Sequence, residues 1–218
     1  MMASPLAIFD MDGTLVDSMF YWKRTAAAVL NEMGICIDDE ADESFLRIGY
    51  YHIPEYVVER YGLPCTAEEF LQKMDNWVLE RYRTEILMKP GVREYLAFLR
   101  DKGVRCVILT ASKTAFIDAF LTRYKMHGYF SATYSANALG MEKSNPAIYD
   151  VIFDQMQCTA ADCVLFDDSD YAITTAAASG LRTVGILDPL FEKNHEALRQ
   201  HSTRTVHRYR ELIEEDIF

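Results

Sequence analysis

The sequence predicts an α/β fold, in which a parallel sheet is covered by helices on both faces and a helical segment is inserted after the first strand. Three observations support this prediction. Short apolar runs alternate with helical patterns through most of the chain, the runs have the length of buried strands, and residues 18–84 show helical patterns without a convincing strand. Strands that alternate with helices form βαβ units, which place their strands in parallel.

Four short apolar runs are the predicted strands. Leu6–Phe9 comes first and leads directly into Asp10. The other three follow much later in the chain, at residues 104–109, 163–166 and 183–187. Continuous apolar runs of this length are typical of strands that are buried on both faces of a sheet.

Helical patterns fill the intervals between these runs. Pro90-Gly91-Val92 begins one helix and Gly103 follows its end, while two more helices are expected at about residues 113–126 and 146–156. Pro146 suits the start of a helix, because the N–H group that proline lacks has no partner in the first turn.

The helical insert divides the chain into two predicted domains. Residues 1–17 and 85–218 form the expected α/β core, and residues 18–84, with three or four amphipathic helices, form the insert. Ligands of open α/β sheets bind at the carboxyl ends of the strands. An insert that leaves the core from this edge can cover the binding site as a lid.

Composition limits the function classes. The chain has 218 residues, of which 50% are hydrophobic and 25% are charged, and this balance is typical of a globular protein with a sizeable core. A net charge of −11 argues against nucleic acid and against an anionic membrane, because both bind clustered Lys and Arg. A site for a phosphorylated substrate must therefore supply its own positive charge, from a metal ion and a well-placed lysine.

The cysteines and the N-terminus predict a cytoplasmic protein. The five cysteines form no CxxC pair and have no His partners at zinc spacing, and an odd number does not suit a closed disulfide framework. Reduced thiols are the simplest expectation. The first residues, MMASPLAIFDMDG, lack the basic region of a signal peptide, and their apolar stretch is too short to cross a membrane.

Two aspartates directly follow the first predicted strand. Asp10 and Asp12 are two residues apart, so in an extended chain their side chains point the same way and share one pocket. Carboxylates this close repel each other unless a cation lies between them or one keeps a proton. A divalent ion can be held here, and a protonated Asp12 can donate to a leaving group. Gly13 lets the chain turn sharply away from the site.

Hydroxyl, amide and ammonium groups follow other strands. Thr110, Ala111 and Ser112 come after the second predicted strand, where a hydroxyl and backbone N–H groups can bind phosphate oxygens. Thr110 or Ser112 can equally cap the next helix. Lys143 precedes the helix that starts near Pro146, from where its ammonium group can reach the strand ends, offset phosphate charge and brace Asp10.

A second acidic pair, Asp167-Asp168, follows the third predicted strand and precedes Ser169. Adjacent acids at the end of a buried strand are costly unless a cation compensates them, and Mg²⁺ prefers a few carboxylates with water and substrate oxygens. A capping role for Asp168 or Ser169 would explain one of these residues but not both acids. With Asp10 as a nucleophile, the whole set matches phosphoryl transfer, in which positioning and charge neutralisation do most of the work.

The order of these motifs resembles the haloacid dehalogenase superfamily across essentially the whole chain. The resemblance rests on DxDGTLxDS at residues 10–18, a strand ending in Thr110, Lys143 with Pro146 three residues later, and Asp167-Asp168-Ser169. The helical insert is similar to the C1-type cap of that family. Two departures are Ser144, where the family commonly has proline, and Ala172, where it commonly has glycine. Neither change removes a reactive group.

The resemblance implies a Rossmann-like core, Mg²⁺ and a role for each motif. Asp10 is the expected nucleophile, and Asp12 the expected general acid and then base. Thr110 and Lys143 are expected to hold phosphate, and the phosphate-binding set is completed by Gly13, Thr14 and Ala111. The expected metal ligands are Asp10, Asp12 through its backbone carbonyl, Asp168 and Asp167.

These residues favour a phosphatase over other members of the superfamily. Dehalogenases and phosphonatases lack an acid at the position of Asp12, and the related membrane ATPases have lysine there. Sugar phosphomutases of the β-phosphoglucomutase branch share both aspartates, but they tend to have histidine where this chain has Trp22 and often valine at Thr14. A receiver-type signalling module and an inactive binding protein are the alternatives from other classes, and turnover of a generic aryl phosphate distinguishes them from an enzyme.

The predicted partner is a small phosphate ester, and the protein is expected to be a monomer or a weak homodimer. Arg47, Tyr51 and His52 flank Gly49 in a plausible lid loop, where they are candidates for contact with the substrate. They can equally pack within the insert or face solvent. The identity of the substrate lies beyond these patterns.

Overall fold

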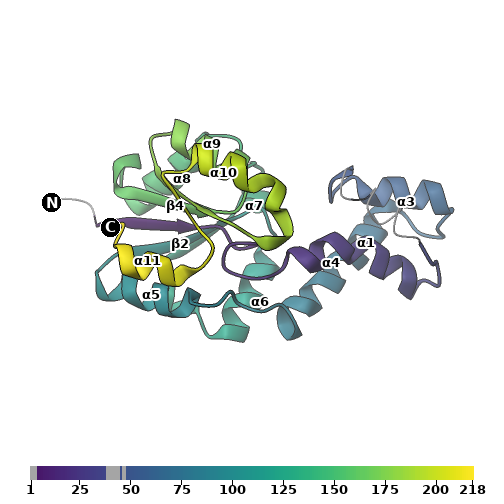
Figure 1. The fold of residues 1–218 in the computed structure, drawn as a ribbon. Coiled ribbons are helices and arrows are strands. Elements are labelled where there is room, and N and C mark those ends of the chain that lie inside the picture. The colour runs from purple at the N-terminus through teal and green to yellow at the C-terminus, as the bar shows by residue number, and fades with distance from the viewer. Residues whose placement is uncertain (1–3, 38–44, 46–47) are drawn as a thin grey trace. The chain divides into compact units, whose positions relative to one another are not determined.

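The computed structural model describes residues 4–37, 45 and 48–218, which divide into two compact units. Residues 1–17 and 87–218 form an α/β unit, and residues 18–86 form a helical unit (Figure 1). Each unit has its own hydrophobic core. The candidate catalytic residues of the sequence all belong to the α/β unit.

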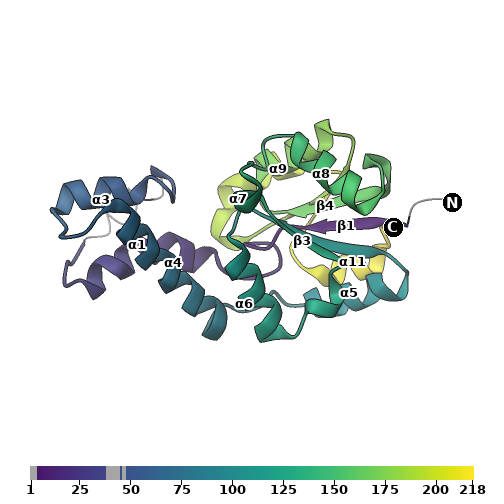
Figure 2. The same cartoon turned by 180° about the vertical axis from the view of Figure 1, so that it is seen from behind.

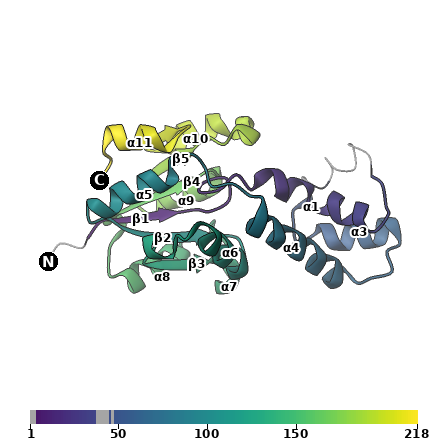
Figure 3. The same cartoon turned by 90° about the horizontal axis from the view of Figure 1, so that it is seen from below.

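The described part of the α/β unit contains a six-stranded sheet that is parallel throughout, which confirms the predicted fold class. Its strand order is β3-β2-β1-β4-β5-β6. Figure 3 labels the first five of these strands in that order. The strands are β1 (Leu6–Phe9), β2 (Arg105–Thr110), β3 (Ala132–Ser135), β4 (Cys163–Asp167), β5 (Arg182–Ile186) and β6 (Arg204–Val206). The central strand β1 is fully buried, as its apolar sequence predicts.

Two of these strands were not expected from the sequence, which predicted only four. β3 and β6 are short strands at the two edges of the sheet, with the sequences ATYS and RTV. Neither has a continuous apolar run, because an edge strand has one open side and is less completely buried. The four predicted strands are present: β1 has the expected ends, and the ends of the other three differ from the expected ones by at most one residue.

Helices cover both faces of the sheet. They are α5 (Val92–Asp101), α6 (Thr114–Tyr124), α7 (Ala136–Leu139), α8 (Ala147–Met156), α9 (Asp170–Ala178), α10 (His195–His201) and α11 (Tyr209–Glu215). Figures 1 and 2 show α8 and α9 on one face and α5 and α11 on the other. Leu6 and Ile8 pack against α8 and α9, while Phe9 stacks on Phe166 and contacts Tyr95 and Tyr209. Alternate residues of β1 thus fill two separate apolar layers.

The helical unit contains α1 (Met19–Glu32), α3 (Ile53–Tyr61) and α4 (Ala67–Thr84) among its described residues. α4 begins with a capping box, in which Glu69 N donates to Thr66 Oγ1 and Thr66 N donates to Glu69 Oε2. Its apolar positions, among them Phe70 and Met74, pack against Val29 and Leu30 of α1. Within the part of the chain that the structure describes, no helix has both the length and the apolar character needed to cross a membrane.

Candidate active site

The register of the sheet brings the predicted catalytic segments to one edge. Phe9 of β1 pairs with Ile108 of β2 on one side and with Phe166 of β4 on the other. Asp10 N continues the pairing and donates to Phe166 O at 2.9 Å. Asp10 and Asp167 therefore leave neighbouring parallel strands at the same level, at the carboxyl ends where open α/β sheets bind ligands.

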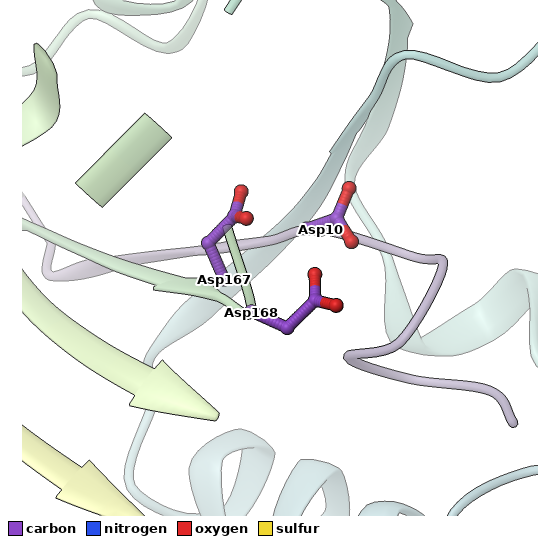
Figure 4. A group of neighbouring side chains, drawn as sticks. All are labelled: Asp10, Asp167 and Asp168. Carbon is purple, nitrogen blue, oxygen red and sulfur yellow. The ribbon is translucent and has the colours of Figure 1, made fainter. Parts of the chain in front are cut away.

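Three carboxylates meet at this edge (Figure 4). One oxygen from each of Asp10, Asp167 and Asp168 lies within 4.8 Å of the other two. Asp10 and Asp167 are buried, and Asp168 is half-buried. Burial and the neighbouring carboxylates Asp167 and Asp12 raise the pKa of Asp10 to about 8, although Lys143 opposes the shift. Burial, together with the carboxylates of Asp10 and Asp167, also raises the pKa of Asp168 well above its ordinary value.

Lys143 joins two of the three acids. Its Nζ donates to Asp10 Oδ1 at 2.7 Å and to Asp167 Oδ2 at 2.6 Å. Burial alone would lower the pKa of this lysine, but Asp10 and Asp167 outweigh the cost of burial and raise it. The ammonium group is therefore charged, and it fixes one oxygen of each carboxylate. The other oxygen of Asp167 accepts hydrogen bonds from the N–H and the hydroxyl of Ser169.

The acidic cluster fits a hard divalent cation. Three carboxylates face one ammonium group, so their full ionisation leaves uncompensated negative charge at a place of little solvent access. All the donors are carboxylate oxygens, which Mg²⁺ and similar ions prefer. The space around Asp168 depends on Gly13, since a Cβ atom at Gly13 would lie 2.1 Å from Asp168 Oδ2. These residues can hold a metal ion together.

Gly13 also makes the turn that follows Asp12. Its φ of +78° lies in the left-handed region, and its N–H donates to Val16 O at 3.0 Å, so this N–H is already used within the turn. The next residue, Thr14, is fully buried, and its hydroxyl has no hydrogen-bond partner among the described residues. The Thr14 carbonyl accepts from Tyr209 Oη at 3.2 Å, which ties the turn to α11.

Asp12 lies beside the segment that follows β2. Its Oδ2 accepts a short hydrogen bond from Ser112 Oγ at 2.6 Å and a weak one from Thr110 Oγ1 at 3.5 Å. Its carboxylate is thus directed toward β2, whereas the acidic cluster is made by Asp10 with the two acids after β4. Ala111, between the two hydroxyl residues, is exposed. The structure therefore places Thr110 next to Asp12 and leaves Ala111 open at the surface.

Two helix caps that the sequence left open as alternatives are not formed. α6 has Lys113 at its N-cap position and receives no side-chain cap, because Thr110 and Ser112 bond within their own segment and to Asp12. Ser169 occupies the N-cap position of α9, but its hydroxyl bonds to Asp167 instead of to the helix. In both places the polar side chain supports a carboxylate of the candidate site.

A family comparison adds to this geometry. Residues 7–186 match the sequence profile of the haloacid dehalogenase-like hydrolases. The chain belongs to this family. The predicted family and the α/β fold are therefore both confirmed.

Curated relatives of this haloacid dehalogenase-like hydrolase include phosphatases. It is 26% identical over 186 residues to hexitol phosphatase B of Escherichia coli strain K12, covering 84% of this chain and 83% of that protein. It is 25% identical over 193 residues to the phosphorylated carbohydrates phosphatase of Thermotoga maritima, covering 84% and 85% of the two chains. The predicted enzyme class, a phosphoric monoester hydrolase, agrees with these relatives.

A solved structure of a putative β-phosphoglucomutase from Thermotoga maritima is similar to this hydrolase with a TM-score of 0.84. The match covers 98% of this chain and all of that one (100%), at 19% sequence identity. At this identity the similarity shows the fold alone.

The candidate substrate residues of the hydrolase belong to the helical unit. Tyr51 is half exposed and makes an edge-to-face contact with Tyr50, with ring centroids 5.3 Å apart. His52 is exposed at the N-cap position of α3. Arg47 lies outside the described residues.

Two polar contacts of the α/β unit were missed by sequence reasoning. One is the bond from Ser112 to Asp12, for which the only signal was the hydroxyl two residues after Thr110. The other is Lys89, whose Nζ lies 2.7 Å from both Asp17 and the buried Asp188 in the α/β unit. No local pattern marks Lys89, because its partners are distant in the sequence.

Proposed function

We propose that this protein is a Mg²⁺-dependent phosphatase that hydrolyses a small phosphorylated metabolite through a phosphoaspartyl intermediate on Asp10. The observation that carries the proposal is the position of Asp10 at the end of the central strand. There it contacts Lys143 and lies beside the acids that follow β4. The phosphatase names of its relatives support the same reaction.

The first half of the reaction transfers the phosphoryl group to the protein. A carboxylate oxygen of Asp10 attacks phosphorus, and the bond between phosphorus and the leaving oxygen breaks. Asp12 donates its proton to that oxygen, so the product leaves as an alcohol. Lys143 holds one oxygen of Asp10, which orients the carboxylate, and its charge offsets that of the phosphoryl group.

The second half releases phosphate. Asp12, now ionised, takes a proton from water as the water oxygen attacks phosphorus, and the bond between phosphorus and Asp10 breaks. Asp10 returns as a carboxylate and Asp12 returns protonated. Thr110 lies next to Asp12 at the same strand edge, where its hydroxyl is placed to donate to a phosphate oxygen.

Mg²⁺ is the proposed cofactor, held by Asp10, Asp167 and Asp168, with the Asp12 carbonyl as a further candidate ligand. When bound, it supplies positive charge that compensates the carboxylates and the phosphate. This source of charge matters here because the whole protein carries a net charge of −11, which opposes the approach of an anionic substrate.

Sugar and polyol phosphates are the proposed substrate class, on the basis of relatives named hexitol phosphatase and phosphorylated carbohydrates phosphatase. The helical unit is the proposed cap, with Tyr51 and His52 as candidate contacts for the leaving group. Trp22 packs edge-to-face on Tyr50 at 5.0 Å and occupies the position at which mutases tend to have histidine. This arrangement favours hydrolysis over phosphoryl transfer between two sugar hydroxyls.

The proposed location is the cytoplasm, with the protein as a monomer or a weak homodimer. All five cysteines are free thiols, as a reducing compartment requires. Light scattering after size-exclusion chromatography measures the oligomeric state directly.

Hydrolysis of p-nitrophenyl phosphate tests the proposed function. We expect turnover with Mg²⁺, none with EDTA, and recovery when Mg²⁺ is restored. Asp10→Asn removes the nucleophile but keeps the size of the side chain, so turnover should fall below detection while the far-UV circular dichroism spectrum stays unchanged. Substantial turnover by Asp10→Asn would overturn the assignment. A panel of sugar and polyol phosphates, with release of inorganic phosphate as the readout, then identifies the substrate and separates hydrolysis from isomerisation.

A further inference from the structure

Ser112 makes a short hydrogen bond to the proposed acid/base, Asp12. The distance of 2.6 Å from Ser112 Oγ to Asp12 Oδ2 is that of a short hydrogen bond between a hydroxyl and a carboxyl oxygen. Thr110 Oγ1, the hydroxyl that the family motif predicts at this place, is 3.5 Å from the same oxygen and contributes little. The two residues joined by the short bond are 100 positions apart in the sequence.

Ser112 is itself held in place on both sides. Its N–H donates to Thr110 Oγ1 at 3.1 Å, and its carbonyl accepts from Ser135 Oγ at 2.7 Å. Ser135 ends β3 and caps α7, since its hydroxyl also accepts from Ala138 N at 3.1 Å. Ser112 and Ser135 are both buried. A chain of hydrogen bonds therefore leads from the start of α7 through two serines to the Asp12 carboxylate.

We propose that Ser112 is a positioning residue that orients the Asp12 carboxylate for proton transfer to the leaving oxygen, and that Ser135 supports it from β3. The terminal torsion of an aspartate is broad, so the plane of its carboxylate turns readily unless a partner fixes it. Proton transfer depends on such geometry, because donor and acceptor must lie within hydrogen-bond distance. Ser112 supplies a short, fixed hydrogen bond to Oδ2 of Asp12, whereas the contact from Thr110 to the same oxygen is weak.

This inference rests on the proposed function, because it assigns a task to Asp12 within that reaction. It is distinct from two simpler roles for Ser112. A serine that only stabilises the loop would affect all substrates equally. A serine that binds substrate phosphate would change KM for every phosphate ester, whatever its leaving group.

The test compares two aryl phosphates that differ in their need for a proton. p-Nitrophenyl phosphate has a good leaving group and needs little protonation, whereas phenyl phosphate has a poor one. The readout is the ratio of kcat/KM for the two substrates, since kcat/KM reports the step in which the leaving group departs. General acid catalysis contributes about 10²- to 10⁴-fold to the rate, so Asp12→Asn should lose far more activity with phenyl phosphate than with p-nitrophenyl phosphate.

Ser112→Ala should change the same ratio in the same direction, by roughly tenfold, because Asp12 remains but is poorly oriented. Ser112→Thr keeps the hydroxyl and should restore the ratio to within about threefold of the wild type. Ser135→Ala should produce a smaller shift of the same kind. In an Asp12→Asn background, Ser112→Ala should have no further effect on the ratio, because the two residues act as one unit. Ser179→Ala, at the end of α9, is the matched control and should leave kcat/KM for both aryl phosphates unchanged.

The outcomes separate failure of this inference from failure of the proposed function. The positioning role is overturned if Ser112→Ala lowers kcat/KM equally for both substrates while Asp12→Asn lowers it mainly for phenyl phosphate. The proposed phosphatase reaction is unaffected by that result. The positioning role is supported if Ser112→Ala and Asp12→Asn both lower kcat/KM mainly for phenyl phosphate and Ser112→Thr restores the ratio. A uniform loss in Asp12→Asn, or a wild type that hydrolyses neither ester, overturns the proposed role of Asp12 and the role of Ser112 with it. Circular dichroism of each variant verifies the fold, and Ser135→Ala provides an independent reading if Ser112→Ala does not fold.

Discussion

The ammonium group of Lys143 lies 2.7 Å from Oδ1 of Asp10 and is almost fully buried, although the lysine follows the aspartate by 133 positions in the sequence. This contact joins the loop before α8 to the end of the central strand. It also connects two of the three acids, because Asp167 accepts from the same nitrogen. One cation thereby orients the proposed nucleophile and limits the repulsion within the acidic cluster.

Lys143→Met should reduce kcat/KM by about 10²-fold or more, the loss typical of removing a preorganised group that stabilises charge in the transition state. The methionine keeps the apolar length of the side chain but leaves Asp10 without its fixed partner. Hydrolysis of p-nitrophenyl phosphate at saturating Mg²⁺ measures the effect. Lys193→Met, at an exposed lysine of the same unit, is the control and should behave as the wild type. Activity above a tenth of the wild-type value in Lys143→Met would contradict the role.

Stability without metal should fall as the pH rises from 5 to 8. Burial raises the pKa of Asp10 to about 8, from an ordinary value of 3.8, so in this window the folded protein holds a proton that the unfolded chain has lost. The free energy of unfolding decreases with pH wherever the folded state binds more protons. Asp168, whose pKa is also raised by burial, acts in the same direction.

Urea denaturation in EDTA at several pH values measures this dependence, and Asp10→Asn is the matched control. The amide cannot titrate, so its stability should fall less steeply between pH 5 and 8. Added Mg²⁺ should stabilise the wild type more at pH 8 than at pH 5, because the cation competes with protons for the same carboxylates. Parallel pH profiles for the two proteins would show that Asp10 does not carry a raised pKa.

Gly13→Ala should abolish metal-dependent turnover. A Cβ atom at this position would lie 2.1 Å from Asp168 Oδ2, so the Asp168 carboxylate must move away from the acidic cluster. The left-handed φ of +78° adds backbone strain of about 1 kcal/mol or more. Loss of stabilisation by Mg²⁺ in a thermal melt, together with loss of turnover, is the expected result.

Gly103→Ala separates the effect of backbone strain from the effect of contact with Asp168. Gly103 has a similar φ of +74° in the same unit, but nothing lies within 4 Å of its added Cβ. This variant should lose stability through backbone strain alone and keep its activity and its response to Mg²⁺. If both alanine variants lose activity to the same extent, contact with Asp168 is not the reason that position 13 is glycine.

The sequence was sufficient to predict the central part of the fold and the acidic residues. β1, β2, β4 and β5 are apolar runs buried within the sheet, and each reactive segment directly follows one of them or precedes a helix. Parallel strands end at one edge, so the βαβ order brings Asp10, Asp167 and Asp168 to the same edge, and the pairing of β1 with β4 then makes them neighbours. Their roles in catalysis stay predictions until the variants are measured.

Edge strands and long-range polar contacts escaped prediction for physical reasons. β3 and β6 are short and partly exposed, so their residues carry no continuous apolar run. The bond from Ser112 to Asp12 depends on two chain segments that meet only in the folded sheet, as does the ion pair of Lys89. Local periodicity encodes which face of an element is buried, but it does not encode which distant hydroxyl or ammonium group meets a given carboxylate.

Lys89→Met should cost about 3 kcal/mol of stability or more, which is the usual loss when one partner of a buried ion pair is removed. Lys89 Nζ lies 2.7 Å from Asp188 Oδ2, and the Asp188 side chain is only 3% exposed, so the variant leaves a carboxylate without its cation. Asp17, whose side chain is 50% exposed, adds little, since water screens it. Lys102→Met, which removes a more exposed ion pair with Asp216, is the control and should change stability by less than about 1 kcal/mol.

The double variant Lys89→Met, Asp188→Asn decides between a buried charge and simple loss of packing. Removing both charges relieves the unpaired carboxylate, so the double variant should recover much of the stability that Lys89→Met loses, as found for buried ion pairs replaced as a unit. Urea denaturation of the four proteins in the cycle measures the coupling. If the double variant is as unstable as the sum of the two single variants, the methylene stem of Lys89 supplies the stability and its charge does not. Recovery would show instead that the cation is kept to neutralise Asp188, whose charge acts on Asp168 and therefore on the acidic cluster itself.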